Sequence, residues 1–254
     1  MARKGFKAVI LPDVHIGDKG YDSVYDSVKK FLKDFKPDKT YLLGDFAECA
    51  SLSHWEMDSK RKMEGKRHFN EINILKRELD FVQKYSKEVI WFEGNHENWV
   101  EQYIDNHPEV EGLVEYPVLL DLKKRGVEWV KHNDLYRIGQ LYMAHGMWIG
   151  EHHAKLHLSK LGCNIVYGHT HRSQVYGINM VMQKTLKAWG LGCLCNKKPS
   201  YLRGKAGSWD HQFAVLYVAS NGEFNLYPID IINNRFYFNG KSYESKSKKV
   251  SSAI

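Results

Sequence analysis

Short polar clusters along this chain supply the side chains that a pair of divalent transition metals requires. Asp13 and His15 form an Asp-x-His motif near the start, and His169 and His171 repeat that alternate spacing further on. A mixture of carboxylate, imidazole and amide donors suits manganese, iron, zinc or nickel. The candidate ligands in chain order are Asp13, His15, Asp45, Asn95, His145, His169 and His171.

Most of these clusters directly follow short apolar runs that predict buried strands, and ligands at strand ends can converge from distant positions. The runs are 8–11, 41–43, 89–92 and 165–167. Alternate residues of an extended chain point the same way, so we expect Asp13 and His15 to face one site from an extended segment. Gly44 and Gly94 precede candidate ligands and permit close backbone approach.

The elements that position these side chains change character along the chain. Strand candidates at 7–11, 40–43 and 89–92 alternate with helical patterns at 21–35 and 72–82, which predicts a parallel sheet covered by helices. From residue 127 onward, short strand candidates dominate, with one helix at 151–161 ending at Gly162. The second half of the chain therefore predicts mostly β structure, which would form a second sheet.

Taken in order, the motifs resemble the calcineurin-like metallophosphoesterase superfamily. Its signature is Asp-x-His, Gly-Asp, Gly-Asn-His-Glu, a lone His and Gly-His-x-His, and every part is present between residues 13 and 171. The resemblance implies an α/β (α+β) fold of four layers, in which two facing mixed β-sheets are flanked by helices. Within the superfamily, the motifs are similar to those of phage- and prophage-encoded phosphoesterases and of the nuclease subunit of double-strand-break repair complexes.

The resemblance also implies a role for each candidate residue. One metal would be held by Asp13, His15 and His171, the other by Asn95, His145 and His169, with Asp45 bridging both. His96 would stand beside the substrate as a catalytic residue without binding metal. Two divalent ions are implied, with manganese favoured and iron, zinc or nickel as alternatives.

Glu48 lies three positions after the bridging aspartate, where many relatives carry an acidic residue that orients the catalytic histidine. We therefore expect Glu48 to orient His96. The protein serine/threonine phosphatases carry arginines after this acidic residue and beside the third motif, whereas this chain has Cys49, Glu93 and Asn98 at those places. The sequence does not favour that subclass.

A basic segment follows the second motif and indicates a class of substrate. It contains Lys60, Arg61, Lys62, Lys66 and Arg67, and Trp55 precedes it. These cations could follow a phosphate backbone while Trp55 stacks on a base. The alternative is that the cations are solvated and Trp55 packs beneath the loop.

The expected function is a binuclear-metal phosphoesterase that hydrolyses phosphodiester bonds in nucleic acid, DNA above all. A metal-bridging hydroxide would attack phosphorus in line while His96 assists the leaving group. One alternative is a phosphomonoesterase or a nucleotide or cyclic-nucleotide phosphodiesterase acting on small substrates. Another is a noncatalytic metal-binding scaffold.

Composition adds few further limits. The 254 residues carry a formal net charge of +7, and we expect one domain over 1–245 and a disordered basic tail over 246–254. We find no signal-peptide pattern and no membrane-spanning run, so a cytoplasmic location is expected, while oligomeric state is left open.

The four cysteines are interpreted as reduced, and the pair Cys193 and Cys195 as packing residues rather than as metal ligands.

Overall fold

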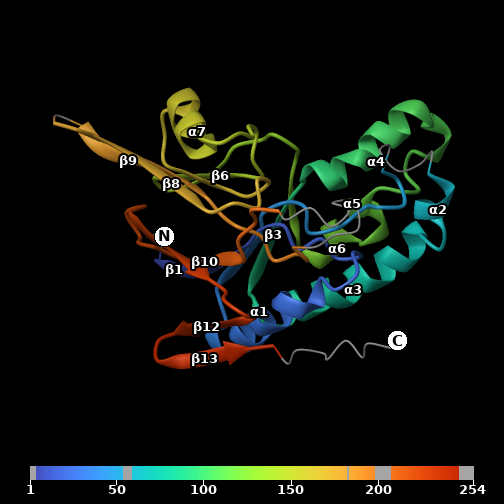
Figure 1. Ribbon diagram of the computed structural model, residues 1–254, viewed down its shortest axis with the longest axis horizontal. Coiled ribbons are helices and arrows are strands. Elements are labelled where there is room, and N and C mark those ends of the chain that lie inside the picture. The colour runs from blue at the N-terminus through green and yellow to red at the C-terminus, as the bar shows by residue number, and fades with distance from the viewer. Residues whose placement is uncertain (1–3, 54–58, 182, 198–206, 246–254) are drawn as a thin grey trace.

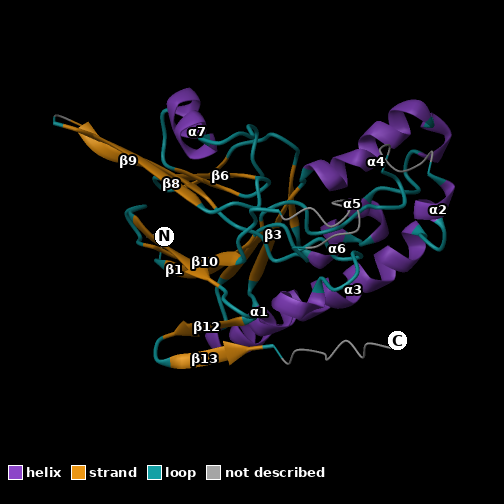
Figure 2. Ribbon diagram, viewed as in Figure 1, coloured by secondary structure: helices purple, strands orange, loops and turns teal. Residues whose placement is uncertain are grey.

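Two mixed β-sheets face each other at the centre of the molecule, and helices cover their outer sides (Figures 1 and 2). The structure is a computed structural model, and it describes residues 4–53, 59–181, 183–197 and 207–245. The two-sheet arrangement flanked by helices confirms the predicted fold class.

The first sheet has six strands in the order β11-β10-β1-β2-β3-β4. The parallel part consists of β1 (Phe6–Leu11), β2 (Lys39–Leu42), β3 (Glu88–Phe92) and β4 (Glu128–Val130). At the other edge, two strands add to β1 in antiparallel fashion, β10 (Gln212–Val218) and β11 (Phe224–Asp230).

The second sheet has five strands in the order β5-β6-β7-β9-β8. They are β5 (Tyr136–Ile138), β6 (Leu141–Ala144), β7 (Ile165–Tyr167), β8 (Gln174–Met180) and β9 (Gln183–Gly190). The pairs β6–β7 and β7–β9 are parallel, and the other two are antiparallel. The β8–β9 hairpin extends well beyond the rest of the sheet (Figure 1).

Helices lie on the outer face of each sheet (Figure 2). The longer ones are α1 (Asp22–Phe35), α3 (His68–Tyr85) and α4 (Asn95–Asn106) on the side of the first sheet and α7 (His153–Leu161) against β8 and β9. Short ones are α2 (Lys60–Met63), α5 (Tyr116–Leu119), α6 (Leu122–Arg125) and the 3-10 turn η1 (Pro108–Val110). A hairpin of β12 (Arg235–Phe238) and β13 (Lys241–Glu244) packs on α1.

The packing of the core explains why the first strands appear in the sequence as unbroken apolar runs. Along β1, Val9 and Leu11 belong to the cluster beneath the helices, whereas Ala8 and Ile10 belong to the cluster between the two sheets. Both faces of the strand are therefore buried, which removes the need for alternate polar residues. A third cluster joins α7 to the outer face of the second sheet.

The structure corrects the expectation that the strands after residue 127 together form the second sheet. The strands β4, β10 and β11 come late in the sequence but pair into the first sheet. Local patterns identified these strands but could not predict their partners, because pairing depends on which edge of the sheet is free. The hairpin of β12 and β13 was not predicted.

Within the described ranges, no helix has both the length and the apolar character needed to cross a membrane. The expected tail at 246–254 lies outside the described residues.

Candidate metal centre

All seven candidate ligands come together where the strands of both sheets end. Asp13 and Asp45 follow β1 and β2, Asn95 begins α4 after β3, and His145 and His169 follow β6 and β7. The carboxyl ends of neighbouring parallel strands meet at one edge, which is why positions so far apart in sequence can converge. The ligand assignment itself stays a prediction.

The backbone at five of these positions is left-handed rather than extended. The φ angles are 45° at Asp13, 53° at His15, 47° at Asp45, 66° at His169 and 57° at His171. The expectation of an extended Asp-x-His segment is therefore wrong. Such conformations cost a non-glycine residue roughly 1–2 kcal/mol and concentrate at functional sites. The turns aim both side chains inward without a strand.

The first ligand group contains Asp13, His15, Asp45 and His171, all buried, with their ligand atoms within 4.8 Å of one another. The Nε2 atoms of His15 and His171 lie 3.3 Å apart. Nε2 of His171 also lies 3.2 Å from Oδ1 of Asp13. This set could hold one cation.

The second group contains Asp45, His145 and His169. Nε2 of His145 lies 3.3 Å from Oδ2 of Asp45 and 3.0 Å from Oδ1 of Asn95, which brings the fourth candidate ligand to the same place. Asp45 belongs to both groups. One carboxylate shared between two sets of nitrogen and oxygen donors is the arrangement that a binuclear centre requires.

The hydrogen bonds behind the ligands show that the site fits cations. Nδ1 of His145 must donate to the carbonyl oxygen of Leu43 at 2.9 Å, so Nε2 of the neutral ring carries a lone pair toward Asp45. Burial, the largest single effect, would lower the pKa of His145, but the charge and hydrogen bond of Asp45, together with Asp13 and the Leu43 carbonyl, raise it to about 10. Without a metal, this site takes up a proton instead.

His171 responds in the same way to its carboxylate neighbour. Burial, the largest single effect, would lower the pKa of His171, yet Asp13, together with the charges of Cys193 and Asp45, raises it to about 9. In contrast, burial lowers the pKa values of His15 and His169 to about 4, so these rings are neutral and able to bind metal at pH 7.

Three glycines allow the ligands to pack against the backbone. A Cβ atom at Gly44 would lie 2.3 Å from Nδ1 of His145, and one at Gly94 would lie 2.2 Å from Oδ1 of Asp45. At Gly168 it would lie 2.4 Å from Oδ2 of Asp13. Because real Cβ atoms do not approach other atoms so closely, any larger residue would displace a candidate ligand.

His96 lies at the edge of both groups. Its backbone N–H donates to Oδ1 of Asp45 at 2.9 Å, and its ring contacts His15 edge to face with centroids 4.4 Å apart. The ring also packs on Trp99, with centroids 4.0 Å apart and the planes tilted by 31°. Nδ1 is hydrogen-bonded to the carbonyl oxygen of Glu48 at 2.7 Å, so Nε2 is left for a substrate.

Glu48 contacts both histidines, but not as expected. Its carboxylate binds Nδ1 of His15 at 2.7 Å and lies 3.6 Å from Nδ1 of His96, which is held by the Glu48 backbone carbonyl. The side chain therefore supports a candidate metal ligand, and the main chain supports His96. Sequence spacing gives no means of distinguishing these two acceptors.

Glu97 is a supporting residue whose role was not predicted. Its buried carboxylate accepts N–H groups from Asp45, Ala47 and Gly94 at 2.9 Å and from the Trp91 indole at 3.2 Å. It therefore fixes the loop that carries Asp45. The only signal in the sequence was its place as the last residue of the Gly-Asn-His-Glu motif.

The structure describes only some of the predicted substrate-binding residues. Lys60, Arg61 and Arg67 are exposed, while Lys66 is half-buried. Burial raises the pKa of Glu48 to about 7, and the charges of His96 and, less strongly, of Lys66 act against this rise. Trp55 and the side chain of Lys62 lie outside the described residues.

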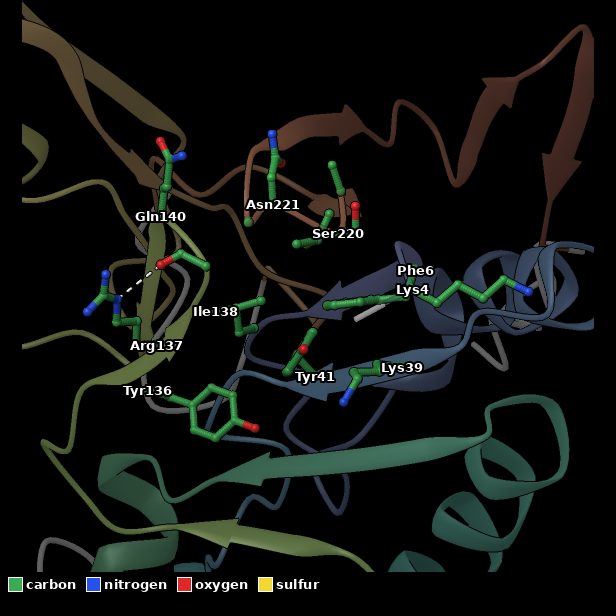
Figure 3. Close-up of a pocket in the computed structure, with 14 residues that line it drawn as sticks. Lys4, Phe6, Lys39, Tyr41, Tyr136, Arg137, Ile138, Gln140, Ser220 and Asn221 are labelled. Atoms are coloured by element: carbon green, nitrogen blue, oxygen red, sulfur yellow. Dashed lines mark hydrogen bonds between the residues drawn. The ribbon is translucent and has the colours of Figure 1, made fainter. Parts of the chain in front are cut away.

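Two cavities bear on where a substrate could bind. One of about 490 Å³ lies beside Trp99 and is also lined by Leu52, Gln102 and Tyr103. Another, of about 790 Å³, lies between the sheets at the beginnings of β1 and β2, lined among others by Lys39 and Tyr136 (Figure 3). The candidate ligands follow the carboxyl ends of β1 and β2. The second cavity lies at the amino ends of the same strands and is therefore remote from the ligands.

Comparison with solved structures identifies the fold. The structure of Vps29 from Chaetomium thermophilum matches 95% of this chain and 100% of its own, with a TM-score of 0.50 and 13% sequence identity. The chain has the metallophosphoesterase fold. A second structure, with 10% identity over 88% of this chain and 98% of its own, has a TM-score of 0.43. No family model and no curated protein sequence matches the chain.

Within the metallophosphoesterase fold, the described residues include side-chain groups that could bind metal ions. At 13% identity, the structural match supports the fold and not an activity. The expected likeness to phage-encoded phosphoesterases and to a repair nuclease stays a prediction.

Proposed function

We propose that this protein is a binuclear-metal-dependent phosphoesterase. The observation that carries the proposal is the position of Asp45, whose carboxylate lies in both ligand groups while accepting the backbone N–H of His96. Two divalent ions bound there would activate water and offset the charge of a phosphate group. One aspartate thus ties the position of His96 to the position of both ions.

The residues of the chain have distinct tasks in this reaction. Glu48 and Leu43 accept the Nδ1 protons of His15 and His145, which keeps their Nε2 atoms available as ligands. His96 directs Nε2 toward the substrate and can donate a proton to the leaving oxygen. Burial lowers the pKa of His96, and a phosphate dianion or monoanion beside the ring would raise it again.

We further propose that the substrate is a phosphodiester in nucleic acid. Lys60 and Arg61 present exposed cations on α2, and Lys66 brings a further cation close to Glu48. Trp99, whose ring packs on His96, lines a cavity together with Tyr103, and these aromatic rings could stack on a base flanking the scissile phosphate. Backbone phosphates on one side and a base on the other would orient a diester.

Hydrolysis of bis-p-nitrophenyl phosphate and of p-nitrophenyl phosphate with added Mn²⁺ tests the activity. We expect turnover of the diester to exceed that of the monoester, and Asp45→Asn to abolish both. Preference for the monoester would favour the small-substrate alternative. Failure to hydrolyse either compound, with metal bound, would contradict the enzymatic proposal and favour a metal-binding scaffold.

A further inference from the structure

A buried segment after β9 lies directly behind the candidate metal ligands. The N–H of Leu194 donates to the carbonyl oxygen of Asp13 at 3.0 Å, and the N–H of Cys193 donates to that of Asp210 at 2.8 Å. The carbonyl oxygen of Cys195 accepts a hydrogen bond from Nε2 of His211 at 2.9 Å. These bonds fix the backbone on both sides of Cys195 relative to the first ligand group.

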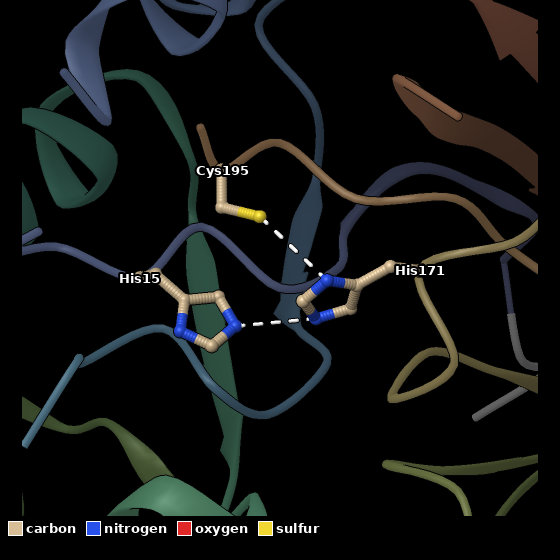
Figure 4. A group of neighbouring side chains, drawn as sticks. All are labelled: His15, His171 and Cys195. Atoms are coloured by element: carbon tan, nitrogen blue, oxygen red, sulfur yellow. Dashed lines mark hydrogen bonds between the residues drawn. The ribbon is translucent and has the colours of Figure 1, made fainter. Parts of the chain in front are cut away.

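The sulfur of Cys195 faces the candidate ligand His171. Sγ lies 3.8 Å from Nδ1 of His171, within hydrogen-bonding distance for sulfur, and Cys195 is only 3% exposed. Figure 4 shows the thiol on one side of the imidazole and His15 on the other. On that other side, Nε2 of His171 meets Nε2 of His15 at 3.3 Å and Oδ1 of Asp13 at 3.2 Å.

The same relationship recurs at other histidines of the centre. Nδ1 is bound by the Glu48 carboxylate in His15 and by the Leu43 carbonyl in His145. In each case the ring directs Nε2 inward, and the acceptor outside the centre selects the tautomer. For His171, the group in that outer position is the thiol of Cys195.

We propose that Cys195 is a positioning residue that holds His171 in its metal-binding tautomer by accepting the Nδ1 proton. This inference rests on the proposed metal centre. It differs from the interpretation of Cys195 as a packing residue, because it requires the sulfur to act as an acceptor. It also differs from direct ligation, in which the sulfur itself would bind a metal.

Other contacts restrain the His171 ring, and the Cys195 thiol is also hydrogen-bonded to the side chain of Cys193. The ring of Trp209 lies against it at 4.3 Å between centroids, and the N–H of Asp210 donates to the His171 carbonyl oxygen at 2.9 Å. An aromatic neighbour and a main-chain bond constrain the position of the ring without accepting its proton. Removal of the thiol should therefore leave the Nδ1 proton without its acceptor while the fold is kept.

The test compares Cys195→Ala and Cys195→Ser with Cys163→Ala, a control at a partly exposed cysteine. Metal affinity is measured by competition with a chelator in the full-length protein. We expect Cys195→Ala to weaken the binding of Mn²⁺ or Zn²⁺ about 10–100-fold, as other losses of an outer partner do, and Cys195→Ser, which keeps an acceptor, to restore most of it. Cys163→Ala should match the wild type.

Two spectroscopic measurements separate positioning from other roles. Long-range ¹H–¹⁵N correlation in the Zn²⁺-loaded protein should show His171 protonated at Nδ1. In Cys195→Ala the Nδ1 proton resonance should move upfield and exchange faster with water, because the proton has lost its acceptor. The resonance is assigned by its loss in His171→Asn. In the Co²⁺-loaded protein, direct sulfur ligation would add a strong thiolate-to-metal charge-transfer band, which would overturn the proposal.

Equal metal affinity and an unchanged Nδ1 proton resonance in Cys195→Ala would also overturn the inference, while the proposed function would stand if the protein still hydrolysed phosphoesters. Conversely, metal binding that depends on Cys195 in a protein without hydrolytic activity would support the inference and contradict the proposed function. A wild-type protein that binds no metal would contradict both.

Discussion

The carboxylate of Glu48 lies 2.7 Å from Nδ1 of His15, although its position in the sequence predicted that it would orient His96. Glu48 contacts His96 as well, but through its backbone carbonyl oxygen, which accepts a hydrogen bond from Nδ1 of His96. Glu48 thereby connects a candidate metal ligand to the candidate catalytic residue.

Replacement of the Glu48 side chain should therefore affect metal binding more than catalysis. Glu48→Ala leaves the carbonyl contact to His96 but removes the acceptor for His15, so we expect metal affinity to fall about 10–100-fold. Glu48→Gln keeps an acceptor and should lose less. The measurements are metal affinity and the hydrolysis rate at saturating metal. A lower saturated rate with unchanged metal affinity would instead support the role predicted from the sequence.

Replacement of His96 should affect catalysis more than metal binding. His96→Ala removes the proton donor but no candidate ligand, so we expect the turnover number to fall about 10²–10⁴-fold with metal content retained. His132, a half-buried histidine outside the centre, provides the control His132→Ala. Full activity in His96→Ala would exclude His96 from catalysis.

A methyl group at Gly94 should disrupt the shared ligand. Gly94→Ala would place Cβ 2.2 Å from Oδ1 of Asp45, and the backbone at both residues belongs to hydrogen-bonded turns that cannot easily shift. We expect metal binding to be lost or reduced at both positions. Gly126→Ala, where nothing lies within 4 Å, should cost only about 1 kcal/mol of stability and leave metal binding intact. Normal metal stoichiometry in Gly94→Ala would show that Asp45 is not held as described.

The buried carboxyl of Glu71 should make stability depend on pH. Burial raises its pKa to about 7, while hydrogen bonds from Tyr116 and from the Cys49 N–H act against this rise. Because the folded pKa lies above the unfolded one, this contribution to stability is present below about pH 4.5 and is lost as the pH rises through 7.

The free energy of unfolding, measured by urea titration, should therefore lose up to about 3 kcal/mol from this group between pH 4 and pH 8. Glu71→Gln should remove that part of the slope, whereas Glu111→Gln, at an exposed side chain, should not. Identical slopes in the wild type and Glu71→Gln would exclude a perturbed Glu71.

The exposed cations of α2 should contribute to nucleic-acid affinity. If Lys60 and Arg61 each contact a phosphate, the Lys60→Ala and Arg61→Ala double variant should reduce the slope of log affinity against log salt by about 1–2 for single- or double-stranded DNA. A matched loss of charge at Lys155 and Lys160 on α7 provides the control. If both double variants bind DNA like the wild type, the substrate is not held by α2.

Sequence patterns predicted the strands well and selected candidate ligands that the fold brings together, because both depend on local features. An apolar run such as 8–11 needs only burial on both faces, and Asp13 or His169 needs only its place after such a run. The backbone at Asp13 and His15 was mispredicted because a left-handed turn and an extended segment can carry the same residues. Long-range relationships, such as β10 beside β1 or Cys195 beside His171, leave no local pattern.

The central claim is that Asp45 is shared by two ions that together support phosphoester hydrolysis. Titration of the metal-free protein with Mn²⁺, with binding and bis-p-nitrophenyl phosphate hydrolysis followed in parallel, tests this most directly. The account predicts two equivalents bound per chain, with activity that appears as the second site fills and is absent in Asp45→Asn. Binding of a single equivalent, or full occupancy without turnover, would contradict it.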